Sequence, residues 1–503
     1  MITLSLQSDE QGVQPANPIP NKLHETRKRL DEIFRNCGDL KWFPWHYGPD
    51  MNQEALSIFF GTIAERKKVN YMKAVLQDLV THEVGPGTDV RIENIIAHFE
   101  KHGVSEESAR VVADFEASIL EVLNGNLVIY FDNWDKALSF ETSGMESRQI
   151  TEPANESVVQ GPRESTVENI NKNVGLLRQR LKSSRFKLVK LNGGGETNTE
   201  VVYCYLEGRV KPDLLKEFER RIEKAKQIEI LETSYIEELI QDVRFSPFPQ
   251  FRYTERPDAA VASMINGKIV VLVQGTGSML ICPGLFVELL QSSEDYYQRS
   301  MYATMIRWLR VCAFFMAFTL PSAYIALTTF HSEMIPTNLL LTILDTREGI
   351  PFPAFFEALI MEFFFELLRE AGIRMPRPIG SAVSIVGALV IGEAAINAGV
   401  ASPIMVVVVA LTGIASFAIP QYNMAIALRI IRLPLMALSA ILGGFGLMFG
   451  LLIVLWHLCT LRSLGQPYLS PIQPADPSLL RDVFVRPSVK KLGRSANNRA
   501  GAG

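Results

Sequence analysis

Hydrophobic positions are distributed unevenly along the chain, and this distribution divides it into two parts. Before Arg310, short apolar runs alternate with charged and polar residues, as in a soluble α/β protein. After Arg310, long apolar runs follow one another with few charges between them. The first of these, residues 311–330, is uncharged. As a helix it would cover about 30 Å, the thickness of the hydrocarbon core of a bilayer.

The second part therefore reads as a membrane domain over residues 299–465. Its hydrophobic segments are 311–330, 354–368, 381–396, 403–420 and 435–461. Basic residues precede the first segment, which places that end in the cytoplasm by the positive-inside rule. Arg429 and Arg432 follow the fourth segment and are expected on the same basic side.

Two features of this topology stay open. The segment 354–368 is short and acidic, so it either spans the membrane within a bundle or is re-entrant. Five crossings would leave the C-terminal tail outside, whereas the basic residues of the tail favour the cytoplasm.

The first part reads as two α/β lobes. Helical periodicity covers residues 22–37 and 53–65, whereas 126–131, 186–191 and 201–206 read as strands. The full division is a disordered tail (1–20), a first α/β lobe (21–142), a connector (143–161), a second α/β lobe (162–298), the membrane domain (299–465) and a polar tail (466–503), disordered after Pro474. The expected fold class is an α/β cytosolic region of two lobes followed by an all-α polytopic membrane domain.

Composition limits the possible functions. The chain has 503 residues, of which 48% are hydrophobic, and a formal net charge of −4, which gives no reason to expect a nucleic-acid partner. Its five cysteines form no CxxC or Cys/His cluster, so no metal site or other cofactor is expected. The start lacks the pattern of a signal peptide. The sequence also lacks HExxH, GxSxG and Walker A motifs, so we expect no enzyme.

Glu393 and Asn397 lie one turn apart on one face of the third hydrophobic segment and its end. A carboxylate at the centre of a membrane helix costs on the order of 2.5–3.5 kcal/mol and usually faces a bundle interior, a partner or water. Both residues are candidates for a pore ring, because acidic rings can select cations. The alternative is a hydrogen bond between two helices of one chain.

The segment 354–368 and the residues after it carry a charged stripe. Glu362, Glu366, Arg369 and Glu370 share one helix face, and Glu357 points nearly opposite. The stripe is a candidate gate or subunit contact. We favour a buried ion-pair network that holds the helices together, because breaking such a pair is strongly destabilising.

Small residues at four-residue spacing predict close helix packing. They are Ser384, Ala388 and Gly392 in one segment, and Gly446 and Gly450 in the last.

Two charged stretches flank the start of the membrane domain, YTERPD (253–258) and SEDYYQR (293–299). Arg256, Asp258, Glu294 and Asp295 are candidates for coupling movement of the lobes to the membrane domain. Ordinary caps and turns explain the same residues equally well.

Several stretches occur in a characteristic order. They are GPRE (161–164), YIEELIQDVRFSPFPQ (235–250), YTERPD, SEDYYQR, PFP (351–353), FELLREAGIRMP (365–376), IGSAVSIVGALVIG (379–392) and SLGQPYLSP (463–471). Through them the chain resembles the A-subunit family of GerA-type spore germinant receptors, the nutrient receptors of bacterial endospores. The resemblance covers residues 127–474.

The resemblance implies a multi-pass protein of the inner spore membrane with its N-terminal region in the cytoplasm. It implies a B subunit that looks like a transporter and binds the nutrient, and a C subunit that is a lipoprotein. It further implies a homo-oligomer in membrane lipid that acts as a nutrient-gated ion channel and triggers germination.

The chain departs from the family at two places. Residues 274–277 read QGTG where the family usually has DGTP, and residues 463–465 read SLG where it usually has SFG. Two alternatives therefore stay open: an accessory paralogue that acts as channel or scaffold without binding nutrient, and a secondary transporter. The latter is less favoured because no inverted repeat is visible.

Overall fold

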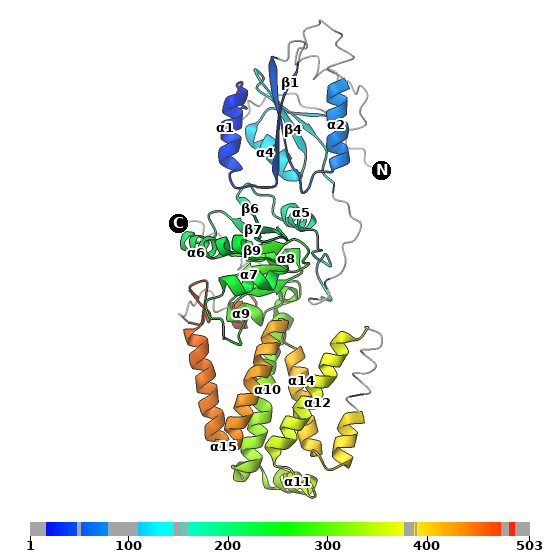
Figure 1. Ribbon diagram of the computed structural model, residues 1–503, viewed down its shortest axis with the longest axis vertical. Helices are drawn as coiled ribbons and strands as arrows, with labels where there is room; N and C mark the ends of the chain where they lie inside the picture. Colours follow the sequence, from blue (N-terminus) through cyan, green and yellow to red (C-terminus); the bar gives the residue numbers. More distant parts are fainter. Residues whose placement is uncertain are drawn as a thin grey trace. The chain divides into compact units, whose positions relative to one another are not determined.

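The computed structural model describes residues 17–47, 52–78, 109–144, 153, 156, 158–376, 387, 390–473 and 482–487. The chain divides into two units. The first comprises residues 1–155, 163–236 and 254–280 and carries one five-stranded sheet and most of a second; the second comprises 156–162, 237–253 and 281–503 and is mainly helical (Figure 1). The expected order, an α/β region followed by a helical region, is confirmed.

The first sheet has the strand order β1-β2-β4-β5-β3, with every neighbouring pair antiparallel. Its strands are β1 (Leu40–Tyr47), β2 (Gln53–Phe60), β3 (Arg110–Val112), β4 (Leu127–Phe131) and β5 (Ala137–Phe140). Helices α1 (Leu23–Ile33) and α4 (Phe115–Asn124) share a core on one face, and α2 (Arg66–Asp78) packs on the other (Figure 1). The predicted helix at 22–37 is thus confirmed as α1.

The prediction of a helix over 53–65 was wrong, because most of this stretch is strand β2. Leu56, Ile58 and Phe60 enter the core on the side of α1, while Ala55 and Phe59 enter the core on the side of α2. A strand covered on both faces is apolar at nearly every position, and such a run also contains the spacings expected of a helix.

The second sheet has the order β6-β7-β9-β10-β8. Its strands are β6 (Phe186–Asn192), β7 (Glu200–Leu206), β8 (Arg252–Thr254), β9 (Ile269–Val273) and β10 (Met279–Cys282), and its helices are α5 (Ile170–Arg180), α6 (Pro212–Ile222), α7 (Thr233–Ile240) and α8 (Pro257–Ile265), with a 3₁₀ helix η2 (Glu223–Gln227) after α6. The predicted strands at 186–191 and 201–206 are confirmed as an antiparallel hairpin.

The helical unit contains α9 (Phe286–Leu289), η3 (Ser293–Tyr296), α10 (Ser300–Thr329), η4 (Ser332–Met334), α11 (Thr337–Arg347), α12 (Ala354–Arg374), a helical stretch at 390–397, α14 (Pro403–Phe417), α15 (Tyr422–Thr460) and the short strands β11 (Arg462–Ser463) and β12 (Gln466–Pro467). Among the described helices, α10 and α15 are long and apolar enough to cross a membrane. Helix α12 is continuous over 21 residues, and α14 is apolar but shorter.

Helix α15 is broken at Gly443, whose φ of 60° and ψ of −140° are not helical. The part at 444–460 folds back on the part at 422–442, so that Gly450 lies against Leu435 and Leu438 (Figure 1). The predicted segment 435–461 straddles this turn. A positive φ favours glycine because it has no Cβ, and Gly443 supplies the reversal inside an apolar run.

The reversal brings the end of α15 back to the end of the unit at which α10 begins. Gly443 contacts Phe330, the residue that follows α10. After α15, Ser463 Oγ donates to the Gln250 carbonyl at 2.5 Å, and the Tyr468 hydroxyl donates to the Pro249 carbonyl at 2.8 Å. The Phe286 N–H, ahead of α10, donates to the Tyr468 carbonyl at 3.0 Å.

Candidate functional site

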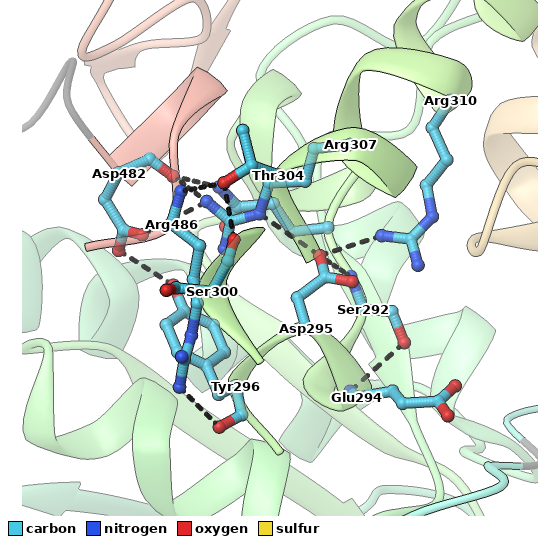
Figure 2. Close-up of polar contacts among 11 residues, drawn as sticks. Ser292, Glu294, Asp295, Tyr296, Ser300, Thr304, Arg307, Arg310, Asp482 and Arg486 are labelled. Carbon is cyan, nitrogen blue, oxygen red and sulfur yellow. Dashed lines mark hydrogen bonds and ion pairs between the residues drawn. The ribbon is translucent and has the colours of Figure 1, made fainter. Parts of the chain in front are cut away.

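A cluster of charged and polar side chains, with Asp295 and Arg307 buried, surrounds the first turns of α10 (Figure 2). Its members, here called the Arg307 cluster, are Asp295, Tyr296, Arg307, Arg310, Asp482 and Arg486. Arg307 donates to Asp295 Oδ2 at 3.3 Å and to Asp482 Oδ1 at 3.1 Å. Arg310 donates to the same oxygen of Asp295 at 2.8 Å. The cluster joins η3, α10 and residues near the C-terminus, although Arg307 and Asp482 are 175 positions apart.

Local structure fixes Asp295 and the two arginines. Ser292 caps η3, and Asp295 accepts a hydrogen bond from the Ser292 N–H at 3.3 Å, which is a capping box. Arg307 and Arg310 are three positions apart in α10, so they share one helix face. Only 3% of the Arg307 side chain is exposed, and a buried charge of this kind is stable only when it is paired.

The Tyr296 hydroxyl donates to Asp482 Oδ2 at 2.8 Å (Figure 2). Burial, and secondly the negative charge of Asp482, raises the pKa of the Tyr296 phenol. The phenol is therefore neutral and remains a donor throughout the physiological pH range.

Residues 482–487 were expected to be disordered, and this was wrong for these six positions. The Phe484 ring stacks on Trp308 with centroids 5.4 Å apart. Arg486 donates to the Tyr296 carbonyl at 2.7 Å, and its N–H donates to Thr304 Oγ1 at 3.2 Å. No pattern in the sequence indicated this structured role, because the partners of these residues lie far away in the chain.

The four predicted coupling residues fall into two pairs. Glu294 accepts hydrogen bonds from the Val159 N–H at 3.3 Å and from Gln298 Nε2 at 2.7 Å, while Asp295 belongs to the Arg307 cluster. Arg256 and Asp258 form an ion pair at 2.9 Å in the first unit, at the start of α8. Coupling between lobes and helices stays a prediction.

The charged stripe of α12 is paired with α15. Glu362 accepts two hydrogen bonds from Arg432, both at 2.6 Å, and Arg432 also donates to the Ala317 carbonyl of α10 at 2.8 Å. Arg432 therefore lies beside the middle of α10. The expectation that Arg429 and Arg432 sit at the basic end of a segment was wrong, because both lie inside α15.

The remaining stripe residues are more exposed. Glu366 pairs with Arg369 and also with Arg429, the latter at 3.2 Å. Glu370 pairs with Arg374 at 2.7 Å. Half of the Glu366 side chain is nevertheless exposed. Each acid of the stripe thus has a basic partner within the chain.

Glu357 lies away from the stripe, as its position on the helix predicts. It is fully buried, accepts the Ser402 N–H at 3.0 Å and pairs with Arg347 at 3.0 Å. Because Ser402 caps α14, this one carboxylate ties α11, α12 and α14 together.

Glu393 and Asn397 are both exposed. Neither makes a side-chain hydrogen bond or ion pair with the residues that the structure describes. The contact between helices of one chain, weighed above as an alternative, is therefore not seen within the described ranges.

Of the predicted packing residues, Gly446 and Gly450 lie at close contacts and Gly392 at an ordinary van der Waals contact, whereas Ser384 and Ala388 fall outside the described residues. A Cβ placed on Gly392 would lie 3.6 Å from Val406 of α14. One placed on Gly446 would meet the Leu438 carbonyl oxygen well inside van der Waals distance, and one on Gly450 would lie 3.2 Å from Leu438 Cδ1. Both later glycines thus serve the hairpin within α15.

Comparison with known proteins assigns the family. The family model described as Bacillus/Clostridium GerA spore germination protein matches residues 28–497. The uncharacterized membrane protein YfkQ of Bacillus subtilis is 39% identical over 93% of this chain and 90% of that protein. Spore germination protein KA of Bacillus subtilis is 47% identical over 73% of this chain and 67% of that protein.

A solved structure also aligns with part of the chain. It is the N-terminal domain of the A subunit of the Bacillus megaterium spore germinant receptor GerK3, with a TM-score of 0.41, 21% identity, and coverage of 54% of this chain and 98% of that one. The family match extends over nearly the whole sequence, including both units described above. The chain belongs to the GerA spore germination protein family.

Proposed function

We propose that this chain is the A subunit of a spore germinant receptor and that several copies form a nutrient-gated ion channel in the inner membrane of the spore. In this proposal a transporter-like B subunit and a lipoprotein C subunit complete the receptor and supply the nutrient signal. The α/β region lies in the cytoplasm, and the chain catalyses no reaction.

One observation carries the proposal: Glu393 and Asn397 are exposed on a helical stretch whose neighbours are apolar. In lipid, an uncompensated carboxylate is costly. In the proposal, a second copy or a water-filled path covers it. Copies arranged around an axis would place a ring of these side chains along a shared path, and such a ring favours cations.

The course of the helices supports a multi-pass arrangement. The hairpin within α15 returns the chain to the end at which α10 begins, so the C-terminal residues and Arg299, Arg307 and Arg310 share one side. A single basic side is what the positive-inside rule requires of a cytoplasmic face. In the proposal, this return adds a crossing and places the basic tail on the cytoplasmic side.

The accessory paralogue is a second candidate, because residues 274–277 read QGTG where the family usually has DGTP, so an anionic side chain is missing there. An accessory paralogue would form the same helical bundle, and its opening would not depend on nutrient-binding partners.

Ion release from vesicles tests the proposal. The full-length protein is reconstituted into potassium-loaded vesicles, alone and with its B and C subunits, and potassium release is followed after nutrient addition. Nutrient-dependent release that requires all three subunits is the expected result. Release without the partners would favour the accessory paralogue, and its absence in every combination would contradict the channel.

A further inference from the structure

Phe245 is the most exposed large hydrophobic residue in the part of the chain that the structure describes. Its exposed fraction is 93%. It belongs to the helical unit, in the loop between α7 and β8. Single exposed apolar residues are common on protein surfaces, so exposure alone assigns no role. Two further observations bear on its role: the hydrogen bonds that hold the loop, and the position of Phe245 along α15.

The loop is held rigidly on both sides of Phe245. The Gln250 side chain, which is buried, accepts the Asp242 N–H at 2.8 Å and donates to the Val243 carbonyl at 2.6 Å. On the other side, Ser246 Oγ lies 2.8 Å from His457 Nε2 of α15. Phe245 is therefore fixed at the tip of an ordered turn.

The contact with His457 sets the level of Phe245 along α15. His457 lies in the last turn of the helix, which ends at Thr460. The part of α15 at 444–460 covers about 25 Å at the rise of an α-helix, close to the thickness of a hydrocarbon core. Because consecutive Cα atoms are about 3.8 Å apart, Phe245 lies close to the level of His457, where this apolar helix leaves the core.

The surroundings at this level have the composition of a membrane interface. Trp456, beside His457, is 72% exposed, and tryptophan concentrates at the boundary between acyl chains and headgroups. Arg244 precedes Phe245 and has an exposed side chain paired with Glu238 at 2.6 Å. Arg462 follows α15 and is exposed. The basic residues can contact lipid phosphates, while the aromatic ring beside them can contact the acyl chains.

We propose that the turn at residues 243–246 is an interfacial anchor that inserts the Phe245 ring into the headgroup boundary of the bilayer. The occupant is lipid, since one aromatic tip offers far less surface than a stable protein interface, which buries on the order of 800 Å² on each partner. The anchor ties the segment that precedes β8 to the membrane surface. This inference rests on the proposed membrane location of the helical unit.

A fluorescent label at position 245 tests the anchor in the full-length protein. Phe245→Cys is made with Cys312→Ser and Cys459→Ser, because these are the two exposed cysteines among five free ones. The label is an environment-sensitive dye. Quenching is measured in phosphatidylglycerol-containing vesicles by lipids with a nitroxide near the headgroup, and separately by aqueous iodide. Trp456→Cys, labelled in the same background, is the membrane reference.

The anchor predicts that nitroxide lipids quench the label at 245 about as strongly as the label at 456, and that iodide quenches it weakly. Strong iodide quenching with no effect of the lipids would place Phe245 in water and overturn the anchor. Protection from both quenchers would mean that protein covers it, which also overturns the anchor. If the lipids fail to quench the label at 456 as well, the proposed membrane location itself is wrong.

Discussion

The two units of the chain differ in how their charged side chains are paired. In the first unit, Arg178 is 1% exposed and donates two hydrogen bonds to Asp39, both at 2.7 Å, with its guanidinium over the Phe60 and Phe186 rings. In the helical unit, Glu393 and Asn397 are exposed on apolar surroundings and pair with no described residue. The buried Arg178–Asp39 pair of the first unit is thus completed within one chain, whereas the helical unit exposes a carboxylate that has no partner among the described residues.

Within the helical unit, the carboxylates also differ in pairing and exposure. Glu362 is paired with Arg432 inside the bundle, Glu366 is paired but half exposed, and Glu393 is exposed without a described partner. Exposed carboxylates of this unit thus occur both with a partner, at Glu366, and without a described one, at Glu393. We infer that mutations near the interior should act on stability, and mutations at the surface should act on assembly and conduction.

The largest effect on stability is expected for Arg178→Met. Removal of this arginine leaves the Asp39 carboxylate buried without its cation, which typically costs about 3–5 kcal/mol. The free energy of unfolding is measured with denaturant on the full-length protein in detergent. The fluorescence of Trp42, Trp45 and Trp134 follows the unfolding of the first unit.

Arg180→Met is the matched control, two positions further along α5. Arg180 pairs with Glu164 in a partly exposed position, and pairs of this kind contribute about 0–1 kcal/mol. Equal losses of unfolding free energy in the two variants would contradict the claim that Arg178 and Asp39 form a buried ion pair that stabilises the first unit.

A smaller loss is expected for Gly446→Ala. The new methyl group collides with the Leu438 carbonyl oxygen across the α15 hairpin, and overpacking typically costs about 1–3 kcal/mol. The melting temperature of the helical unit in detergent, followed by circular dichroism, should fall.

Gly450→Ala supplies the comparison for the hairpin. Its methyl group would meet side-chain atoms rather than backbone, Leu438 Cδ1 at 3.2 Å and Leu435 Cδ2 at 3.3 Å, and alanine has the better helix propensity by about 1 kcal/mol. The melting temperature should change little or rise. A larger fall for Gly450→Ala than for Gly446→Ala would argue against the hairpin at Gly443.

The smallest effect on stability is expected for Glu366→Gln. Its ion pairs with Arg369 and Arg429 lie on a half-exposed carboxylate, and exposed pairs are worth about 0–1 kcal/mol. The protein should therefore accumulate in membranes nearly as the wild type does. Quantitative blotting of membrane fractions measures this. Loss of the protein would show that the Glu366 pairs hold the bundle together.

Much of the fold could be read from the sequence, for physical reasons. The apolar run after Arg310 is long and uncharged, and it became α10; the runs at 186–191 and 201–206 became a hairpin. Strand β2 could not be read, because both of its faces are buried. The reversal at Gly443 was also missed: Gly443 and Gly444 form a glycine pair of the kind that marks turns, but the residues on both sides are apolar, so the run looks like one continuous segment.

The candidate site was predictable only in its residue types. The acids of α12 were visible as costly charges in an apolar segment. Their partners were not, because Arg432 is 70 positions from Glu362. Asp482 and Arg486 gave no signal either, because only the folded chain brings them to Arg307 and its neighbours. Charges that pair over long separations leave no periodic signal in one sequence.

Cation conductance of the Glu393→Gln variant tests the central claim most directly. The wild type and the variant are reconstituted with the B and C subunits, and nutrient-evoked potassium current is recorded across planar bilayers, with Glu370→Gln as control. We predict that Glu393→Gln lowers the cation current while the assembled mass stays unchanged, and that Glu370→Gln has little effect. An unchanged current in Glu393→Gln would contradict the account.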